Sequence, residues 1–467
     1  MPVNSFDNYP MSWKPSLTGK KPPLYKALVN LLEEDINQGV LKPGDMLPPQ
    51  RELADYLDVN LSTISRAFKL CEQKGLISGK IGKGTYISSD VHVNSTLIAP
   101  SKTRGIIEMG AAYPVYNQND HVIKFMKNIL NQANAAEFLQ YSSPGGTFSQ
   151  KSAAVKWLKK VHLHTTEDHV MLATGGQNAL CAVLSSLFQS GDRIGTDPLI
   201  YSGVKTLAKM LGIQLVPIPQ EGGEMSPAAL RNYCKNEGLK GIYLIPDFQN
   251  PTTHSMSLHT REEIAAIANE NNIIVIEDAI NSLFCKTPHV PIAMLAPERT
   301  IYISSASKAL CAGLRISFIV APFAYREPLE MALYNINMIV SPFNAEVIRQ
   351  LIESGVADQI LAERKEMTLE RNTLTDSILG DYCLAGDPYC NFRWLLLPDG
   401  WGGKSFETCA KNAGVQVYCA ERFVIGNSPV PAAVRISIAA PKDLEELGKG
   451  LRVLKSILSQ EDVFTMI

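Results

Sequence analysis

The stretch Ser304-Ser305-Ala306-Ser307-Lys308 lies in the second half of the chain, and Arg315 follows seven residues after the lysine. Directly before this stretch, residues 300–303 form an apolar run that predicts a β strand. A lysine amine can form a carbon–nitrogen double bond with an aldehyde, and serine and arginine side chains can hold a phosphate. The stretch therefore predicts a reactive lysine beside an anion-binding turn at the end of a strand.

Two side chains upstream complete this chemistry. Asn250 lies 58 residues and Asp278 lies 30 residues before Lys308. A carboxylate can keep a pyridine nitrogen protonated so that the ring acts as an electron sink, and an amide can donate to the 3′ oxygen of the ring. Asp278 follows the apolar run 273–276, where a carboxylate is costly unless it has a cationic partner such as that nitrogen. We therefore predict pyridoxal 5′-phosphate (PLP) as the cofactor, with Lys308 and Asp278 as the catalytic residues.

Other motifs in this part of the chain fit a cofactor site, but each also has a plainer explanation. Thr174-Gly175-Gly176-Gln177 opens a predicted helix, whose N-terminus attracts phosphate, although two glycines there are more often a tight turn. Tyr201 can stack on the ring, although a single tyrosine is more often part of the core. Asn250-Pro251 is commonly no more than a turn. The occurrence of all of them in this order, at the ends of strands, favours the cofactor site.

Helices alternate with apolar β runs from residue 106 onward. This alternation predicts an α/β fold with a doubly wound, mostly parallel sheet, and the segment after about residue 344 should form a smaller subdomain. The predicted strands are residues 170–173, 193–196, 214–218, 241–245, 273–276, 300–303 and 317–320. Open sheets of this kind bind ligands at the carboxyl ends of their strands, which is where the motifs above fall.

The first 87 residues predict a different module with three helices. These helices are expected over residues 22–36, from about residue 50, and over 61–74, with Asn60 as the N-cap and Gly75 as the stop of the third. In the third helix one face is apolar, and the opposite face carries hydroxyls and cations that suit a DNA major groove. The apolar face is Ile64, Ala67, Phe68 and Cys71, and the polar face is Ser62, Ser65, Arg66 and Lys69. Taken alone, the polar face is more simply an ordinary solvated helix surface.

Two short β runs after the third helix favour DNA binding. Leu76-Ile77-Ser78 and Thr85-Tyr86-Ile87 flank a turn of glycines and lysines, which predicts a wing that reaches phosphate or the minor groove. With this wing, the segment resembles the GntR family of winged helix-turn-helix regulators. The matching residues are Gly39, Pro43-Gly44, Leu47-Pro48, Arg51-Glu52-Leu53-Ala54, Val59, Thr63, Ala67, Leu70, Gly75-Leu76-Ile77, Gly82 and Gly84-Thr85. The DNA contacts that the resemblance implies are Arg51, Thr63, Ser65, Arg66, Lys80 and Lys83, although Arg51 could instead form a buried salt bridge.

The segment from residue 106 to the C-terminus resembles the fold-type I aminotransferases of the aspartate aminotransferase class. The resemblance implies that Lys308 forms the aldimine with PLP, Asp278 pairs with the ring nitrogen and Asn250 donates to the 3′ oxygen. It also implies that Tyr201 stacks on the ring. The phosphate ligands that it implies are Gly175, Gly176, Gln177, Ser305, Ser307 and Arg315.

Two further residues match aminotransferase positions outside the cofactor motifs. Arg435, in Val434-Arg435-Ile436-Ser437, matches the arginine that takes the α-carboxylate of the substrate, although it could be an ordinary surface-strand arginine. We therefore expect Arg435 to bind an effector carboxylate. Tyr141 matches a tyrosine that reaches the phosphate in the partner subunit, which implies a homodimer.

Two positions depart from the aminotransferase pattern. The family usually has a tyrosine two or three residues after the aspartate, which also bonds the 3′ oxygen, whereas Ala279-Ile280-Asn281 follow Asp278 here. The glycine that usually follows Asn-Pro-Thr is replaced by Thr253. The first departure weakens control of the ring electronics and the second crowds a loop. Both argue against efficient turnover, but neither argues against cofactor binding.

A GntR-type module joined to an aminotransferase-like body is the architecture of the MocR subfamily of bacterial transcriptional regulators. We expect residues 1–87 to be the DNA-binding domain, 88–104 a linker, and 105–467 the PLP- and effector-binding domain. The expected function is that of a homodimeric regulator that binds double-stranded DNA and senses PLP, or an amine or amino-acid effector, through aldimine chemistry at Lys308, with little or no turnover. The alternatives are a working aminotransferase with an attached DNA-binding module and, third, a purely structural dimer.

The composition is that of a globular protein, with 45% hydrophobic and 19% charged residues and a net charge of −2. Residues 1–87 carry 11 Lys and Arg against 9 Asp and Glu, a mild excess that permits DNA binding without proving it. Nine scattered cysteines without a Cys-x-x-Cys motif argue against a disulfide framework. No signal peptide or membrane span is evident, so we expect a cytoplasmic protein. His162, His164 and His169 lack the companions of a metal site and are expected in a surface loop.

Overall fold

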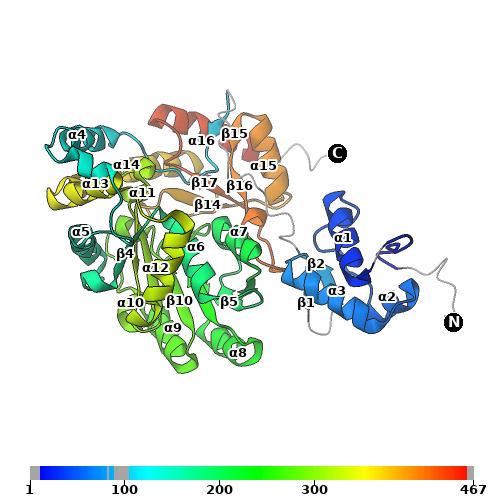
Figure 1. The fold of residues 1–467 in the computed structure, drawn as a ribbon. Coiled ribbons are helices and arrows are strands. Elements are labelled where there is room, and N and C mark those ends of the chain that lie inside the picture. The colour runs from blue at the N-terminus through cyan, green and yellow to red at the C-terminus, as the bar shows by residue number, and fades with distance from the viewer. Residues whose placement is uncertain (1–10, 21, 81–83, 89–104, 460–467) are drawn as a thin grey trace.

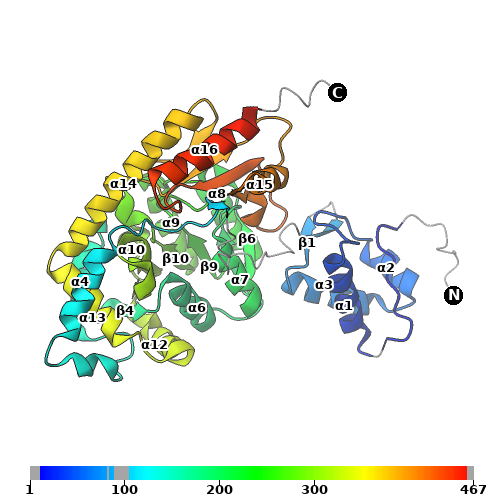
Figure 2. The ribbon, with the colours of Figure 1, turned by 90° about the horizontal axis from the view of Figure 1, so that it is seen from above.

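The computed structural model of the chain describes residues 11–20, 22–80, 84–88 and 105–459. It has two lobes, and two views at right angles both show the small N-terminal lobe to one side of the large one (Figure 1, Figure 2). The small lobe contains the three N-terminal helices and a hairpin, and the large lobe contains the sheets from residue 105 onward.

The small lobe has the predicted winged-helix elements. They are α1 (Leu24–Asn37), α2 (Gln50–Leu57), α3 (Leu61–Gln73), and the strands β1 (Ile77–Lys80) and β2 (Gly84–Ile87). The two strands pair antiparallel, and Lys80 lies opposite Gly84 at the tip of the hairpin. The apolar face predicted for α3 is buried in one cluster with α1 and α2. Gly75 has φ +66°, a conformation that glycine adopts without strain, and the chain can therefore turn out of α3 into the hairpin.

The centre of the large lobe is a seven-stranded sheet with the strand order β4-β12-β11-β10-β9-β5-β6. Its strands are β4 (Val170–Ala173), β5 (Arg193–Thr196), β6 (Gln214–Pro217), β9 (Gly241–Leu244), β10 (Ile274–Asp278), β11 (Thr300–Ser305) and β12 (Ser317–Val320). β12 runs antiparallel to both of its neighbours, and the other adjacent pairs are parallel. The predicted strands and the mostly parallel sheet are thus confirmed.

Helices cover both faces of this sheet. One face packs against α4 (Asn119–Leu130), α5 (Phe148–Leu158), α13 (Pro342–Glu353) and α14 (Val356–Leu379) towards β4, and against α8 (Pro227–Glu237), α9 (Leu258–Asn271) and α10 (Ile292–Leu295) towards β6. The other face packs against α6 (Gly176–Leu187), α7 (Ser202–Leu211) and α12 (Phe323–Asn337). Along β11, Tyr302 packs against the helices of the first face, and Ile301 and Ile303 pack against the helices of the other face. Because successive side chains of a strand point to opposite faces, an uninterrupted apolar run is what a sheet covered on both sides requires.

The C-terminal part forms the smaller subdomain that the sequence predicts. It contains a four-stranded sheet of β13 (Leu384–Ala385), β14 (Phe392–Leu396), β17 (Ala433–Ser437) and β16 (Tyr418–Cys419), with α15 (Gly403–Asn412) and α16 (Leu444–Leu458). The structure adds one feature: β3 (Ile107–Glu108), at the start of the large lobe, pairs in parallel with β15 (Val415–Gln416). The segment that follows the expected linker therefore belongs to this subdomain. Across the described ranges, no helix is both long enough and apolar enough to pass through a bilayer.

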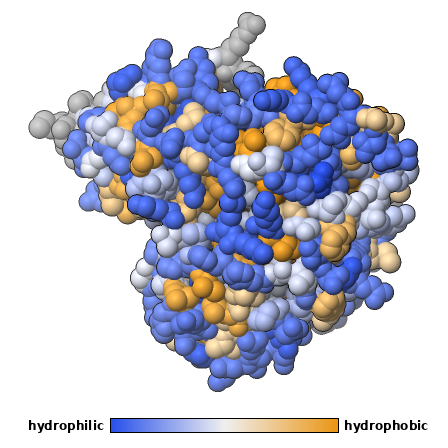
Figure 3. Space-filling view, turned by 90° about the vertical axis from the view of Figure 1, so that its left-hand side faces the viewer, coloured by the Kyte–Doolittle hydropathy of each residue, from blue (hydrophilic) through white to orange (hydrophobic). Residues whose placement is uncertain are grey.

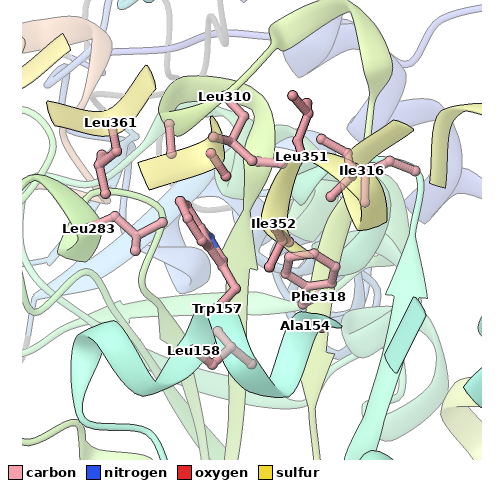
Figure 4. Packing of buried hydrophobic residues seen from close by; sticks show 14 of the residues in the cluster. Ala154, Trp157, Leu158, Leu283, Leu310, Ile316, Phe318, Leu351, Ile352 and Leu361 are labelled. Carbon is pink, nitrogen blue, oxygen red and sulfur yellow. The ribbon is translucent and has the colours of Figure 1, made fainter. Parts of the chain in front are cut away.

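Trp157 of α5 is fully buried between the first helix layer and the sheet, among Leu158, Leu283, Leu310 and Leu361 (Figure 4). We predict that Trp157→Ala destabilises the large lobe by about 3–5 kcal/mol, because it removes a large apolar side chain and leaves a cavity. Urea unfolding followed by circular dichroism measures this loss. The control is Met210→Ala on α7, which is 67% exposed and should change stability by less than about 0.5 kcal/mol. An unchanged unfolding midpoint for Trp157→Ala would contradict the packing described.

Candidate functional site

The predicted cofactor residues of the large lobe come together at the carboxyl ends of its strands. Asp278 is the last residue of β10, and Lys308 lies on the short helix α11 (Ala306–Ala309) that directly follows β11. Gly175, Tyr201 and Asn250 follow β4, β5 and β9 in the chain. Parallel strands end at the same edge of a sheet, so residues far apart in the sequence converge there.

Asp278 is buried and only half satisfied. Its Oδ2 accepts a hydrogen bond of 2.7 Å from the Tyr243 hydroxyl, whereas Oδ1 accepts none from the described residues. Burial raises the pKa of Asp278 to about 6, against the hydrogen bond from Tyr243, the charge of Lys308 and the backbone N–H of Ile280, which lower it. A protonated ring nitrogen beside Oδ1 would supply the missing donor and favour the ionised carboxylate. The environment of Asp278 therefore fits the role predicted for it.

Lys308 has the electrostatic setting of an activated amine. Its Nζ donates to Asn281 Oδ1 at 3.3 Å and lies 6.0 Å from the centre of the Phe392 ring. Desolvation and the charge of Arg435 together lower the pKa of Lys308 to about 8, and the charge of Asp278 opposes this shift. A lowered pKa increases the fraction of neutral amine, which is the form that attacks an aldehyde.

A compact anion cup lies next to Lys308. Gly175 has φ +84°, and a Cβ built on it would lie 2.1 Å from Arg315 Nη2, so the guanidinium packs directly on the glycine backbone. Arg315 Nη1 donates to Ser307 Oγ at 2.9 Å. Ser305 caps α11 by accepting from the Ser307 N–H at 3.2 Å. Backbone N–H groups, hydroxyls and a guanidinium thus converge where a phosphate could be held.

Two predicted phosphate ligands lie at the edge of this cup. Gly176 is the first residue of α6. The Gln177 side chain accepts from the Tyr201 hydroxyl at 3.1 Å and donates to the Gly203 carbonyl at 3.0 Å. In this structure Gln177 therefore orients the aromatic ring that was predicted to stack on the cofactor. Gly203 is required for this contact, because a Cβ there would lie 2.3 Å from the Tyr201 ring.

Arg435 lies on β17 of the small subdomain and is buried, which rules out the alternative of a surface-strand arginine. Its guanidinium donates to Asn250 Oδ1 and, at 2.6 Å, to the Gly110 carbonyl. Burial lowers the pKa of Arg435 to about 10, and its Nε has no partner among the described residues. The rings of Phe392, Tyr418 and Phe423 surround it with centroids at 5.6, 5.7 and 4.8 Å. A buried guanidinium held only by neutral groups favours a carboxylate ligand.

Sequence reasoning missed two residues of this site. Tyr243 lies within an apolar strand, and nothing in the sequence indicates that its hydroxyl bonds the key aspartate. Asn281 was noticed only as the absence of a tyrosine, whereas it is the side chain that accepts from Lys308. The role of Asn281 could have been found by asking which hydrogen bonds an asparagine can form in place of the missing tyrosine.

Tyr141 lies outside this cluster of contacts. It is 81% exposed, and no hydrogen bond of its hydroxyl is found within the described ranges. An exposed tyrosine is compatible with its predicted role in a partner subunit.

The DNA-contact candidates are mostly exposed on the small lobe. Arg51 of α2 is exposed and has no ion pair with any described residue, so the alternative of a buried salt bridge is wrong. Ser65 donates to Gln50 Oε1 at 2.7 Å, which links α3 to α2. The Arg66 guanidinium lies 4.3 Å from the centre of the Tyr25 ring, so it packs over α1.

The other candidates are only partly described. Thr63 is half-buried in α3, and Lys80 ends β1. Lys83 lies outside the described residues. Arg51 and Ser65 are exposed, as residues of the predicted DNA surface must be.

Comparisons with known protein families match both lobes. Residues 24–87 match the gntR family of bacterial regulatory proteins, and residues 105–454 match the aminotransferase class I and II family. The chain belongs to the MocR subfamily of GntR-type transcriptional regulators. It is 47% identical to the HTH-type transcriptional regulator YdeF of Bacillus subtilis over 458 residues, which cover 98% of this chain and 99% of that one.

More distant relatives and solved structures agree with this membership. The pyridoxine biosynthesis regulator PdxR of Corynebacterium glutamicum is 21% identical over 74% of this MocR-type chain and 76% of its own. The α-aminoadipate aminotransferase LysN of Thermus thermophilus is 22% identical, with a TM-score of 0.70 over 78% of this chain and 94% of its own. The kynurenine aminotransferase of Pyrococcus horikoshii is also 22% identical, with a TM-score of 0.71 over 77% of this chain and 92% of its own. The large lobe therefore has the aminotransferase fold, which implies PLP as cofactor.

Gly175→Ala should weaken PLP binding at least about tenfold, or about 1.4 kcal/mol, because the new methyl group displaces Arg315 from the anion cup. Titration of the apoprotein with PLP, followed by absorbance, measures this affinity. Gly191→Ala is the matched control, because it has a similar φ of +94° but nothing within 4 Å of its Cβ. Equal loss of affinity in both variants would show that backbone strain, and not the contact with Arg315, is responsible.

Proposed function

We propose that this MocR-type chain is a PLP-dependent transcriptional regulator that binds double-stranded DNA and senses PLP, or an amine or amino-acid effector, at Lys308. One observation carries the proposal: within the described residues, the site has a buried acceptor without a donor, Asp278 Oδ1, and a buried guanidinium without an anion, Arg435. A ligand that supplies a protonated ring nitrogen and a carboxylate would satisfy both. In this proposal residues 1–87 bind DNA, 88–104 link the modules, and 105–467 bind cofactor and effector.

PLP, when bound, supplies an aldehyde carbon with which an amine can form a carbon–nitrogen double bond. The chain's own residues would do the rest. Lys308 supplies the resident amine, and Asp278 fixes the charge of the ring nitrogen. Arg435 orients the effector through its carboxylate, and the anion cup of Gly175, Ser307 and Arg315 holds the phosphate.

The contact between Arg435 and Asn250 gives the effector a means of changing the structure. Arg435 is on the small subdomain and Asn250 on the large one, so their hydrogen bond joins the two. A carboxylate that takes the guanidinium would loosen this joint. An effector can change the DNA affinity only to the extent that it binds one arrangement of the two subdomains more tightly than another. The Arg435 guanidinium allows two such arrangements, because it can pair either with Asn250 or with the effector carboxylate.

We further propose that the regulator is a homodimer. Figure 3 views the side of the large lobe on which α4 and α13 lie and shows several apolar patches there. The elements of this region carry large exposed apolar side chains: Leu130 at the end of α4, Leu139, Tyr141, and Phe148 at the start of α5. An exposed apolar surface of this kind is typical of a subunit interface. It also places Tyr141 where a second subunit could use it.

A working aminotransferase is the second candidate, and it is favoured by the complete set of Lys308, Asp278, Asn250 and Arg435. Two residues argue against it. Asn281 replaces a tyrosine, and Thr253, in the glycine position, adopts φ +68°. Single-turnover spectroscopy with a panel of amino acids, followed by addition of a keto acid, separates the candidates. Repeated turnover would support the enzyme, and a single reversible change of spectrum would support the regulator.

The covalent part of the proposal is tested by borohydride reduction of the protein with PLP, followed by mass spectrometry. We expect the wild type to gain the mass of the reduced cofactor at Lys308, and Lys308→Ala to gain none, because no other described amine lies beside Asp278. Lys205→Ala is the control, because Lys205 is buried and is held by the Arg422 and Val424 carbonyls. Labelling of the Lys308→Ala protein at another active-site lysine would refute the assignment.

The DNA-binding part is tested with the promoter region upstream of the gene. Arg51→Ala should weaken binding to this DNA and reduce the salt dependence of the affinity by about one ion, because it removes one phosphate or base contact. Fluorescence anisotropy at several salt concentrations measures both. Lys411→Ala, an exposed cation on the large lobe, should leave both values unchanged. Identical affinities for Arg51→Ala and wild type would remove Arg51 from the DNA surface.

A further inference from the structure

Asn281 has a fixed orientation in the turn after β10. It is buried three residues after Asp278, its Nδ2 donates to the Phe248 carbonyl at 2.9 Å, and its Oδ1 accepts from Lys308 Nζ at 3.3 Å. A carbonyl can only accept and an ammonium can only donate, so the amide cannot be flipped without losing both bonds. Asn281 therefore presents a hydrogen-bond acceptor, and not a donor, to the reactive lysine.

We propose that Asn281 is a positioning residue that holds the Lys308 nitrogen in its protonated form when this nitrogen is bonded to PLP. The inference rests on the function proposed above and deepens it. It assigns a task to the position at which the aminotransferase tyrosine is missing.

The charges around Lys308 explain why a local acceptor matters. Arg435 disfavours a second positive charge beside it, and desolvation acts in the same direction. Asp278 and Cys390 favour the charge, but Cys390 is a buried thiol whose own pKa is raised, so it is neutral. Asp278 would be occupied by the ring nitrogen once PLP is bound. The Asn281 carbonyl then remains as the described acceptor within hydrogen-bond distance of Nζ.

A protonated nitrogen also matters for exchange with an effector. The effector amine adds to the carbon that is bonded to Lys308, a new carbon–nitrogen bond forms, the bond to Lys308 breaks, and one proton passes from the incoming to the leaving nitrogen. No oxidant or reductant is required. Lys308 leaves as a neutral amine with two N–H groups, and Asn281 Oδ1 is already placed to accept a hydrogen bond from it. Asn281 thus favours both the reactive state before exchange and the released lysine after it.

The test is a pH titration of the visible absorbance of the full-length protein with PLP bonded to Lys308, which reports protonation of that nitrogen. Asn281→Leu is similar in size but has no acceptor, so it should lower the pKa of the nitrogen by about one unit. Asn281→Asp keeps an acceptor and adds a negative charge, so it should leave the pKa unchanged or raise it. Both variants lose the bond to the Phe248 carbonyl, and the pair therefore separates the acceptor from the loop contact.

The outcomes distinguish this inference from the proposed function. An equal drop in both variants, or no change in either, would overturn the role of Asn281 while the wild type still bonds PLP. The wild type also gives a test that needs no folded variant. If borohydride reduction shows the bond to Lys308 but the protein lacks the visible band at neutral pH, the nitrogen is not protonated and the inference fails alone. Absence of any bond to Lys308 would instead refute the proposed function.

Discussion

The site depends on one electrostatic constraint, which is the placing of a buried guanidinium, a half-buried lysine and a buried carboxylate close together at the edge of a sheet. Lys308 and Arg435 disfavour each other's charge, and Asp278 is the buried carboxylate that faces Lys308. Arg435 is held only by Asn250 and a backbone carbonyl. Such an arrangement is costly without a ligand, because desolvated charges need partners of opposite sign. These charged groups lower the stability of the fold when no ligand is bound, which is typical of binding sites.

The sheet explains how the chain brings these groups together. β9, β10 and β11 are parallel neighbours, so the segments that carry Asn250, Asp278 and Lys308 leave the sheet at adjacent points. Helices packed on both faces bury the strands between them. Arg435 comes from the other subdomain and reaches the same place through β17. The geometry of the site is therefore shared between a rigid sheet and a part that can shift against it.

Much of the fold was predictable because it rests on local patterns. Apolar runs gave the strands of the large sheet, and the spacing of Ile64, Ala67, Phe68 and Cys71 gave the buried face of α3. The positions of Asp278 and Lys308 at strand ends followed from the same patterns. What could not be predicted were contacts between distant segments. The bond from Tyr243 to Asp278, the use of Gln177 to orient Tyr201, and the packing of Arg66 over Tyr25 each depend on side-chain directions that one sequence does not specify.

In the proposed regulator, the contacts of Arg435 would link the effector site to the DNA module. Its second hydrogen bond goes to the Gly110 carbonyl, and Gly110 follows β3, where the large lobe begins after the expected linker. A Cβ on Gly110 would lie 2.5 Å from the Tyr418 ring, so this backbone is pressed against the aromatic residues around the guanidinium. A carboxylate at Arg435 would thus compete with Asn250 on one side and disturb the segment leading to the DNA module on the other. In this proposal, PLP without a carboxylate partner would fill the cofactor site but leave both bonds in place. Cofactor and effector would therefore be distinct signals, because they differ in whether they engage Arg435.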